Sequence, residues 1–310
     1  MIFDPYYWSK NRLDEFTKKI EPINNDGLKL SDGDIWSIKK YFVLDYLIDG
    51  FVTIYRKHFP NFFYVDTYCG TGLVGFKDKD LSNVNFPGSA LVAAFRNPTH
   101  PFTEYFFWDN DPEAISALAE RLKKLGSSVG KHNYQPSIQE FKKSVNFIMQ
   151  KVKFGNIFFF VIDPTGFIEI KWSLMKQLLS IKKADFIFTF MTHVISRHRS
   201  NAKDGNAYSK SLDEFYGNNT WIPYTEGEEL MKLYKNQIKQ FKKHVVDMPV
   251  FQAGKQLTYH ILVATDNDGA KSIIDSAKKI TQVQTEMLDG GLKVISNIHD
   301  DLTKWMKSSE

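Results

Sequence analysis

The sequence predicts an α/β fold in which helices cover both faces of a mostly parallel, seven-stranded sheet whose last strand is antiparallel. Strand-like apolar segments alternate with segments of helical period along most of the 310 residues, as expected for repeated βαβ crossovers. Near the C-terminus, two strand-like segments, DMPVFQ and LTYHILVAT, are separated by a turn at Gly254 and Lys255. Strands joined by so short a turn are antiparallel, because a parallel pair needs a longer crossover.

The first half of the chain supplies three of the predicted strands. A helical pattern of apolar residues from Ile38 to His58 leads into the first strand. In DPEAISALAERLKKL, Asp111 is placed to cap a helix and Pro112 lies in its first turn. The predicted order is a helix over 38–58, a strand over 62–67, a short helix in PGSALVAAFR, a strand in EYFFWD, the helix capped by Asp111, a weak strand at 132–136 and a helix over 138–152.

The second half supplies the remaining strands and a long polar region. The predicted order is a strand in NIFFFVID, a helix in SLMKQLLSIK, a strand in ADFIFTFM, a polar loop over 192–225, a lysine-rich helix, the hairpin and further helices to the C-terminus. No repeat and no Pro/Gly/Ser-rich linker interrupts this pattern. We therefore expect one domain over residues 1–310, with a helical N-terminal extension over residues 1–60.

Composition disfavours several classes of site. The single cysteine, Cys69, allows no intrachain disulfide and no CxxC-type metal site, and we expect no bound metal. No segment has the apolar length of a membrane span, and the N-terminus lacks an apolar signal-like region. These features predict a cytoplasmic protein that does not associate with a membrane.

The segment YVDTYCGTGLVG, residues 64–75, joins the first strand to a glycine-rich turn that matches the loops of two cofactor classes. Its three glycines match the GxGxxG of NAD-binding crossovers. Asp66 followed by Gly70 and Gly72 instead resembles the first motif of methyltransferases that use S-adenosylmethionine (SAM). Asp66 favours SAM, because a carboxylate attracts the α-ammonium group of SAM and repels the pyrophosphate of NAD.

The second strand ends at Asp109, the position at which an acidic residue binds the cofactor ribose in folds of this kind. In NAD-binding crossovers that residue follows the glycines by about 20 positions, and Asp109 lies much further along the chain. The separation requires an insertion over residues 76–96, which disfavours NAD. Helix capping is the alternative role for Asp109.

FFFVIDPTGF is an apolar strand that ends in an acidic residue and a proline, at a strand end where ligands bind. Asp163 and Pro164 resemble the start of the [D/N/S]-P-P-[Y/F/W] motif of amino-methyltransferases. There, the first side chain and the following carbonyl accept hydrogen bonds from the target amine, and the aromatic residue stacks on a base that has left its helix. Thr165 and Gly166 occupy the last two motif positions here, and Phe167 follows. The displaced aromatic residue leaves transfer to adenine N6 an open question.

Motifs over residues 34–280 resemble, in their order and spacing, the three-Cys-motif partner (TcmP) family of SAM-dependent methyltransferases. The resemblance is carried by DIWSIKKYFVLDYL, YVDTYCGTG, PGSALVA, FFWDND, VIDPTG, FIFTF, the region of Arg197, FYGNNTW and YHILVATDN. It implies a Rossmann-like class I methyltransferase fold, SAM as the cofactor and a partner protein that carries three cysteines. It also matches Trp36 and Lys39 to the family's entry helix.

We expect the ligand site beyond the carboxyl ends of the strands. The expected SAM site comprises Asp66, Tyr68, Gly70, Thr71, Gly72, Asp109, Asn110, Ser137 and Ile138. The expected catalytic turn comprises Asp163, Pro164, Thr165 and Gly166, and the expected substrate contacts are Lys39, Phe167, His193 and Arg197. For the segment around Arg197, phosphate contact and a solvated loop are equally weighted interpretations.

The sequence favours SAM-dependent methylation of an amine, with nucleic acid as the expected substrate. Two alternatives stay open. A non-catalytic subunit that binds SAM or nucleic acid for the cysteine-motif partner is favoured by Thr165 and Gly166 at the last two motif positions. The second alternative, an NAD-dependent oxidoreductase, is supported only by the GxGxxG pattern.

Overall fold

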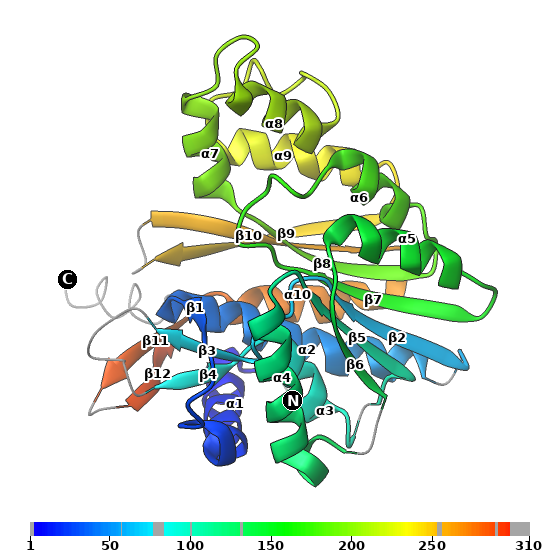
Figure 1. Cartoon of the computed structure of the whole chain (residues 1–310). Helices are drawn as coiled ribbons and strands as arrows, with labels where there is room; N and C mark the ends of the chain where they lie inside the picture. The colour runs from blue at the N-terminus through cyan, green and yellow to red at the C-terminus, as the bar shows by residue number, and fades with distance from the viewer. Residues whose placement is uncertain are drawn as a thin grey trace.

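A computed structural model of the chain describes residues 3–56, 58–76, 84–99, 101–130, 133–252, 256–288 and 291–297. Its centre is a seven-stranded sheet with the order β6-β5-β2-β7-β8-β10-β9 (Figure 1). The strands are β2 (Asn61–Asp66), β5 (Glu104–Asp109), β6 (Tyr134–Ile138), β7 (Asn156–Ile162), β8 (Ala184–Phe190), β9 (His244–Gln252) and β10 (Gln256–Thr265). The first five are parallel, and β10 is antiparallel to both β8 and β9. The predicted α/β class and the antiparallel hairpin are confirmed.

Helices cover both faces of this sheet (Figure 1). One face carries α1 (Pro5–Ile20), α2 (Ile38–Tyr55), α3 (Ser89–Arg96), α4 (Pro112–Leu125) and α10 (Lys271–Ile280). The other face carries α5 (Phe141–Lys151), α6 (Trp172–Leu179), α7 (Thr192–Ser200), α8 (Ala207–Tyr216) and α9 (Gly227–Ile238). Within the described residues, no helix is long and apolar enough to cross a membrane.

Strand β7 shows why the central strands are apolar throughout. Phe159 and Val161 pack into the core on the α2 side, whereas Phe158 and Phe160 pack into the core on the α5 side. Successive side chains of a strand point to opposite faces, so a strand covered on both sides buries every residue. This burial holds the carboxyl end of β7 in place, where the predicted catalytic turn begins.

A small second sheet lies beside the loop that follows β2. β1 (Ser31–Gly33) is parallel to β3 (Leu73–Phe76), which pairs antiparallel with β4 (Asn85–Pro87). The predicted N-terminal extension therefore contains a strand in addition to its helices. This strand brings the segment before α2 against the glycine-rich loop.

The predicted polar loop over 192–225 is wrong, because this region contains α7 and α8. The apolar stripe of α7 is short, with only Thr192 and Ile195 buried, so its helical period is weak in the sequence. For α8 a signal was present: the Asn206 side chain caps the helix by accepting a hydrogen bond from the N–H of Ser209, and Gly217 ends it with φ +74°.

The C-terminal prediction is also wrong in part. After α10 the chain forms the antiparallel pair β11 (Val283–Leu288) and β12 (Gly291–Asn297) instead of further helices. The predicted turn at Gly254 and Lys255 lies outside the described residues. The helix predicted over 138–152 begins at Phe141, because β6 extends to Ile138.

Candidate active site

The loop between β2 and β3 contains two glycines with left-handed backbone conformations. The φ angle is +60° at Gly70 and +84° at Gly72. A Cβ atom at Gly70 would lie 2.6 Å from the Oγ of Ser31, and one at Gly72 would lie 2.8 Å from the Cδ1 of Leu118. The positive φ angles favour glycine at both positions, and a Cβ would also force the Ser31 or Leu118 side chain to move. The third glycine of the motif, Gly75, lies within β3, so the loop opens into a strand rather than a helix.

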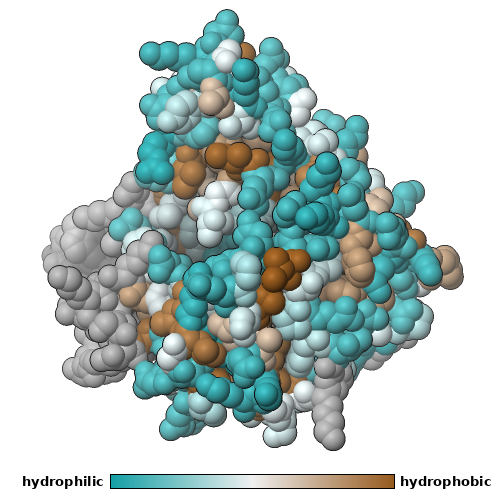
Figure 2. Space-filling view, in the orientation of Figure 1, coloured by the Kyte–Doolittle hydropathy of each residue, from teal (hydrophilic) through white to brown (hydrophobic). Residues whose placement is uncertain are grey.

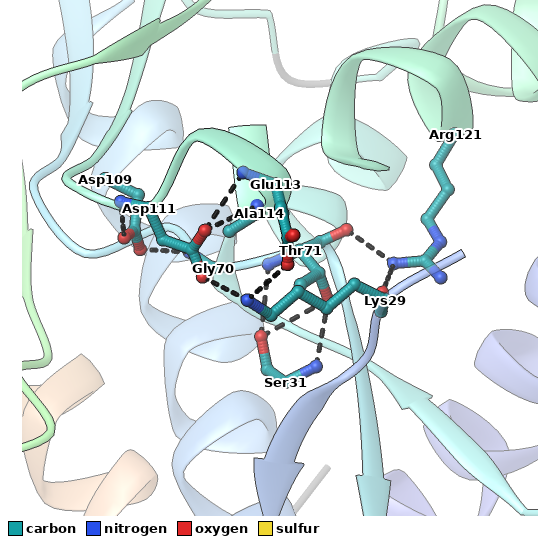
Figure 3. Close-up of polar contacts among 9 residues, drawn as sticks. All are labelled: Lys29, Ser31, Gly70, Thr71, Asp109, Asp111, Glu113, Ala114 and Arg121. Atoms are coloured by element: carbon teal, nitrogen blue, oxygen red, sulfur yellow. Dashed lines mark hydrogen bonds and ion pairs between the residues drawn. The ribbon is translucent and has the colours of Figure 1, made fainter. Parts of the chain in front are cut away.

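Asp109, the last residue of β5, is held by two backbone N–H groups (Figure 3). The N–H of Gly70 donates to its Oδ2 and the N–H of Asp111 donates to its Oδ1, each at 3.0 Å. Asp111 in turn caps α4 by accepting from the N–H groups of Glu113 and Ala114, as predicted. Asp109 therefore ties the glycine-rich loop to β5, and each of its carboxylate oxygens keeps a lone pair for a ligand.

Residues 26–33, which we call the N-terminal strap, run beside the glycine-rich loop (Figure 3). The N–H of Ser31 donates to the Oγ1 of Thr71 at 3.0 Å, and the N–H of Thr71 donates to the Oγ of Ser31 at 3.1 Å. The Nζ of Lys29 lies 2.6 Å from Asp111 and 3.0 Å from Glu113. The strap is thus bonded both to the loop and to the start of α4.

A buried arginine of α4 fixes the strap in this position (Figure 3). The guanidinium of Arg121 donates to both carboxylate oxygens of Asp26 at 3.0 Å. It also donates to the carbonyl oxygens of Lys29 at 2.9 Å and Thr71 at 2.8 Å. One side chain therefore joins α4, the strap and the glycine-rich loop.

Asp66, the last residue of β2, is completely buried behind the loop. Its Oδ1 accepts a hydrogen bond from the N–H of Tyr68 at 3.3 Å, and its Oδ2 has no hydrogen-bond partner among the described residues. Burial raises the pKa of Asp66 to about 7 although the Ser89 side chain and the Tyr68 N–H act to lower it, and the nearby carboxylates of Asp163 and Asp109 add to the rise. A cation close to the loop would lower the free-energy cost of burying the charged Asp66 carboxylate.

The turn after β7 places Asp163 opposite Lys40, which is not one of the predicted site residues. The Nζ of Lys40, in the first turn of α2, lies 2.5 Å from the Oδ2 of Asp163, and both side chains are 15% exposed. Burial lowers the pKa of Lys40, but the Asp163 carboxylate, together with the nearby Tyr41 and Tyr259, holds that pKa above its ordinary value. The two residues form an ion pair at the carboxyl end of β7.

These elements surround one cleft with a volume of about 920 Å³. Figure 2 shows it as the hollow near the centre of the face in view, below the lobe formed by α7, α8 and α9. The strap, the glycine-rich loop and the turn after β7 line it, together with Thr258 and Tyr259 of β10. A cleft of this size at the carboxyl ends of parallel strands can hold a cofactor and part of a second substrate.

The cleft is strongly acidic. Its lining contains six carboxylates against two ammonium groups, a formal net charge of −4: Asp32, Asp34, Asp109, Asp111, Asp163 and Glu169 against Lys29 and Lys40. Over the part of the chain that the structure describes, no three His, Cys, Asp or Glu side chains are grouped so that they could hold a metal ion. The field in the cleft favours a cationic ligand over an anionic one.

The structure brings most of the predicted cofactor and catalytic residues into this cleft. Its lining includes Tyr68, Gly70, Thr71, Gly72, Asp109, Asn110, Asp163, Pro164, Thr165 and Gly166. They come from three different strand ends, as the topology of a parallel sheet requires. Their chemical roles stay predictions.

Other predicted residues lie elsewhere. Ser137 and Ile138 are exposed at the end of the outer strand β6, and Asp66 is behind the loop. The Phe167 ring is 2% exposed and packs against Phe215 and His198, with centroid distances of 5.2 and 4.7 Å. It does not line the cleft, so it is not in place to stack on a substrate there.

The predicted basic contacts are also separate from the cleft. Arg197 is exposed on α7, and His193 lines a second, smaller pocket together with Glu226, Glu228 and Glu229. These glutamates make that pocket unfavourable for phosphate. Lys39 is 6% exposed and does not line the cleft, whereas its neighbour Lys40 does.

No family model matches the chain, and no curated protein matches it. Among solved structures, the chain is similar to the crystal structure of protein LPL1258 from Legionella pneumophila str. Philadelphia 1, which is described with the family model DUF519. The two chains are 13% identical, the match covers 81% of this chain and 92% of that one, and the TM-score is 0.47. A similarity at this level carries no argument about function, so the function has to be argued from the site.

Proposed function

We propose that this protein is a SAM-dependent methyltransferase that methylates an amine, with an amine of nucleic acid as the first candidate acceptor. One observation carries the proposal: a single acidic cleft brings together the glycine-rich loop, Asp109 and the Asp163 turn. The sheet adds support, because its five parallel strands and the antiparallel β10 agree with the class I methyltransferase fold that the resemblance implies. Membership of the TcmP family and a cysteine-motif partner stay predictions.

The charge of the cleft supports SAM over NAD. SAM carries a sulfonium and an α-ammonium group, whereas NAD brings a pyrophosphate into a lining with a formal charge of −4. The unpartnered Oδ2 of Asp66 also fits a cation beyond the loop. In addition, a dinucleotide fingerprint requires its glycines to open a helix, and here they open into β3.

Each part of the cleft has a role in this proposal. Gly70 and Gly72 would let the cofactor approach the loop backbone closely, and the free lone pairs of Asp109 would accept hydrogen bonds from its ribose hydroxyls. Bound SAM supplies an electrophilic methyl group, whose bond to sulfur breaks as the acceptor nitrogen forms its new bond to carbon. Asp163 and the carbonyl of Pro164 orient that nitrogen by accepting hydrogen bonds from its N–H groups. After methyl transfer the nitrogen loses one proton to solvent.

A non-catalytic SAM-binding subunit is the second candidate. It is favoured by the burial of Phe167, which leaves the turn without the aromatic residue of the amino-methyltransferase motif. Methyl transfer itself distinguishes the two candidates, because only the enzyme moves label from SAM to an acceptor.

Calorimetry is expected to show binding of SAM and S-adenosylhomocysteine and no binding of NAD. Tritium from labelled SAM is then expected to appear in one class of acceptor when the protein is incubated with fractionated cellular nucleic acids and proteins. Cofactor binding without transfer to any fraction would support the non-catalytic candidate, and NAD binding without SAM binding would contradict the proposal.

The affinity for SAM is expected to rise by roughly tenfold between about pH 5.5 and about pH 7.5. Burial raises the pKa of Asp66 to about 7, so its carboxyl gains charge over this interval and attracts the cofactor more strongly. The interval stays below the titration of an α-amino group at roughly pH 7.7–8.0. Calorimetry on Asp66→Asn should show weaker binding with little dependence on pH.

Asp185 provides the matched control for this prediction. Burial in β8 raises the pKa of Asp185 to about 7 as well, but Asp185 is the second residue of its strand, at the opposite end of the sheet from the cleft, whereas Asp66 ends β2 directly behind the glycine-rich loop. Asp185→Asn should therefore leave the pH dependence of SAM binding intact. If both variants lost it equally, the effect would come from fold stability and not from the cofactor site.

A further inference from the structure

The ion pair between Lys40 and Asp163 lies in the cleft at the position proposed for the acceptor amine. We infer that Lys40 is a positioning and specificity-determining residue, which holds Asp163 in the orientation that receives an uncharged amine and excludes protonated amines from that position. The inference rests on the proposed methyl transfer.

The geometry leaves a defined set of acceptors next to the pair. The Nζ of Lys40 lies 2.5 Å from the Oδ2 of Asp163, so this oxygen is engaged and the carboxylate is fixed in rotation. The Oδ1 of Asp163 and the carbonyl oxygen of Pro164 remain, and both residues line the cleft. Two acceptors match the two N–H groups of an uncharged –NH₂, whose nitrogen lone pair is then directed away from them.

The surroundings keep Lys40 in place. Its Nζ lies 5.0 Å from the centroid of the Tyr41 ring and 5.8 Å from that of the Tyr259 ring, within range of cation–π attraction. The titratable groups near the pair include these two tyrosines, from α2 and β10, the Asp66 carboxyl from the end of β2, and Asp34, which acts on Tyr259. Because Tyr41 and Tyr259 are buried and neutral, the Lys40 charge is balanced mainly by Asp163.

The cleft is therefore divided by charge. Among the described residues, Asp109 accepts hydrogen bonds only from backbone N–H groups, so its negative charge suits the cationic cofactor, whereas the ion pair at Asp163 is locally neutral. A protonated alkylamine placed against Asp163 would meet the Lys40 ammonium, and like charges at such distances repel strongly where water is excluded. A nucleobase amine is uncharged at neutral pH and avoids this repulsion.

The test compares wild type with Lys40→Met and Lys40→Arg in transfer of tritium from SAM, using single-stranded oligonucleotides and poly-L-lysine as the two acceptors. Wild type is expected to label the oligonucleotides at least about tenfold faster than poly-L-lysine. Lys40→Met is expected to lower kcat on oligonucleotides by about tenfold or more with KM for SAM unchanged. It should also shift the acidic limb of the pH–rate profile upward and raise the relative rate on poly-L-lysine.

Lys40→Arg keeps the positive charge and is expected to restore the pH profile and the preference for oligonucleotides. Lys235→Met is the matched control, because it removes the lysine of another Lys–Asp pair, with Asp247, outside the cleft. An unchanged profile and preference in Lys40→Met, or a wild type that prefers poly-L-lysine, would overturn the inference while methyl transfer itself stands. A wild type that binds no SAM, or transfers label to no acceptor, would overturn the proposed function and the inference with it.

Discussion

Replacing Asp163 by alanine is expected to lower the rate of methyl transfer by about 10²–10⁴-fold without loss of cofactor binding. The variant removes the carboxylate that we propose accepts a hydrogen bond from the acceptor amine, and it leaves the Lys40 ammonium without its partner. The glycine-rich loop and Asp109, which we propose to bind the cofactor, are not altered. Single-turnover transfer of tritium measures the rate, and calorimetry with S-adenosylhomocysteine measures the binding.

One further variant separates the hydrogen-bonding role of Asp163 from its charge, and a second serves as a control. Asp163→Asn keeps one side-chain acceptor and is expected to lose less activity than Asp163→Ala, because the amide oxygen can still receive an N–H. Asp268→Asn removes an exposed carboxylate that is also paired with a lysine, Lys243, outside the cleft, and should behave as wild type. Methyl transfer by Asp163→Ala at the wild-type rate would remove this residue from the mechanism.

The sequence was informative about the fold wherever local periodicity and burial agree. β7 is apolar on both faces and was recognisable as a buried strand, and Asp111 and Pro112 marked the start of α4. The region of α7 and α8 was missed, because α7 buries few apolar residues and its basic side chains resemble a solvated loop. The β11–β12 pair was missed as well, because the sequence pattern predicts helices over that segment.

The residues that line the cleft were predictable only where they follow a strand end. Asp109 and Asp163 were found because the carboxyl ends of parallel strands meet in one crevice. Lys40 was not, since helical period alone does not distinguish which of two adjacent lysines faces the cleft, and the residue matched to the entry helix was Lys39. Ser31 and Arg121 act on the loop from segments about 40 and 50 positions away, and no local pattern shows such contacts.

Replacing Arg121 by methionine is expected to lower the free energy of unfolding by about 3–5 kcal/mol. The Asp26 side chain is only 3% exposed and would lose the guanidinium that donates to both of its oxygens. The carbonyl oxygens of Lys29 and Thr71 would lose a donor at the same time. Urea denaturation followed by tryptophan fluorescence measures the change.

Lys124→Met is the matched control, because Lys124 lies 4.0 Å from the same Asp26 carboxylate but is 43% exposed, and its loss should cost less than about 1 kcal/mol. Under conditions where both variants are folded, Arg121→Met should also bind S-adenosylhomocysteine more weakly, since Arg121 joins the strap and the loop to α4. A variant that is destabilised but binds normally would show that the strap supports the fold alone. A loss below about 1 kcal/mol would contradict the assignment of Arg121 as the residue that fixes the strap.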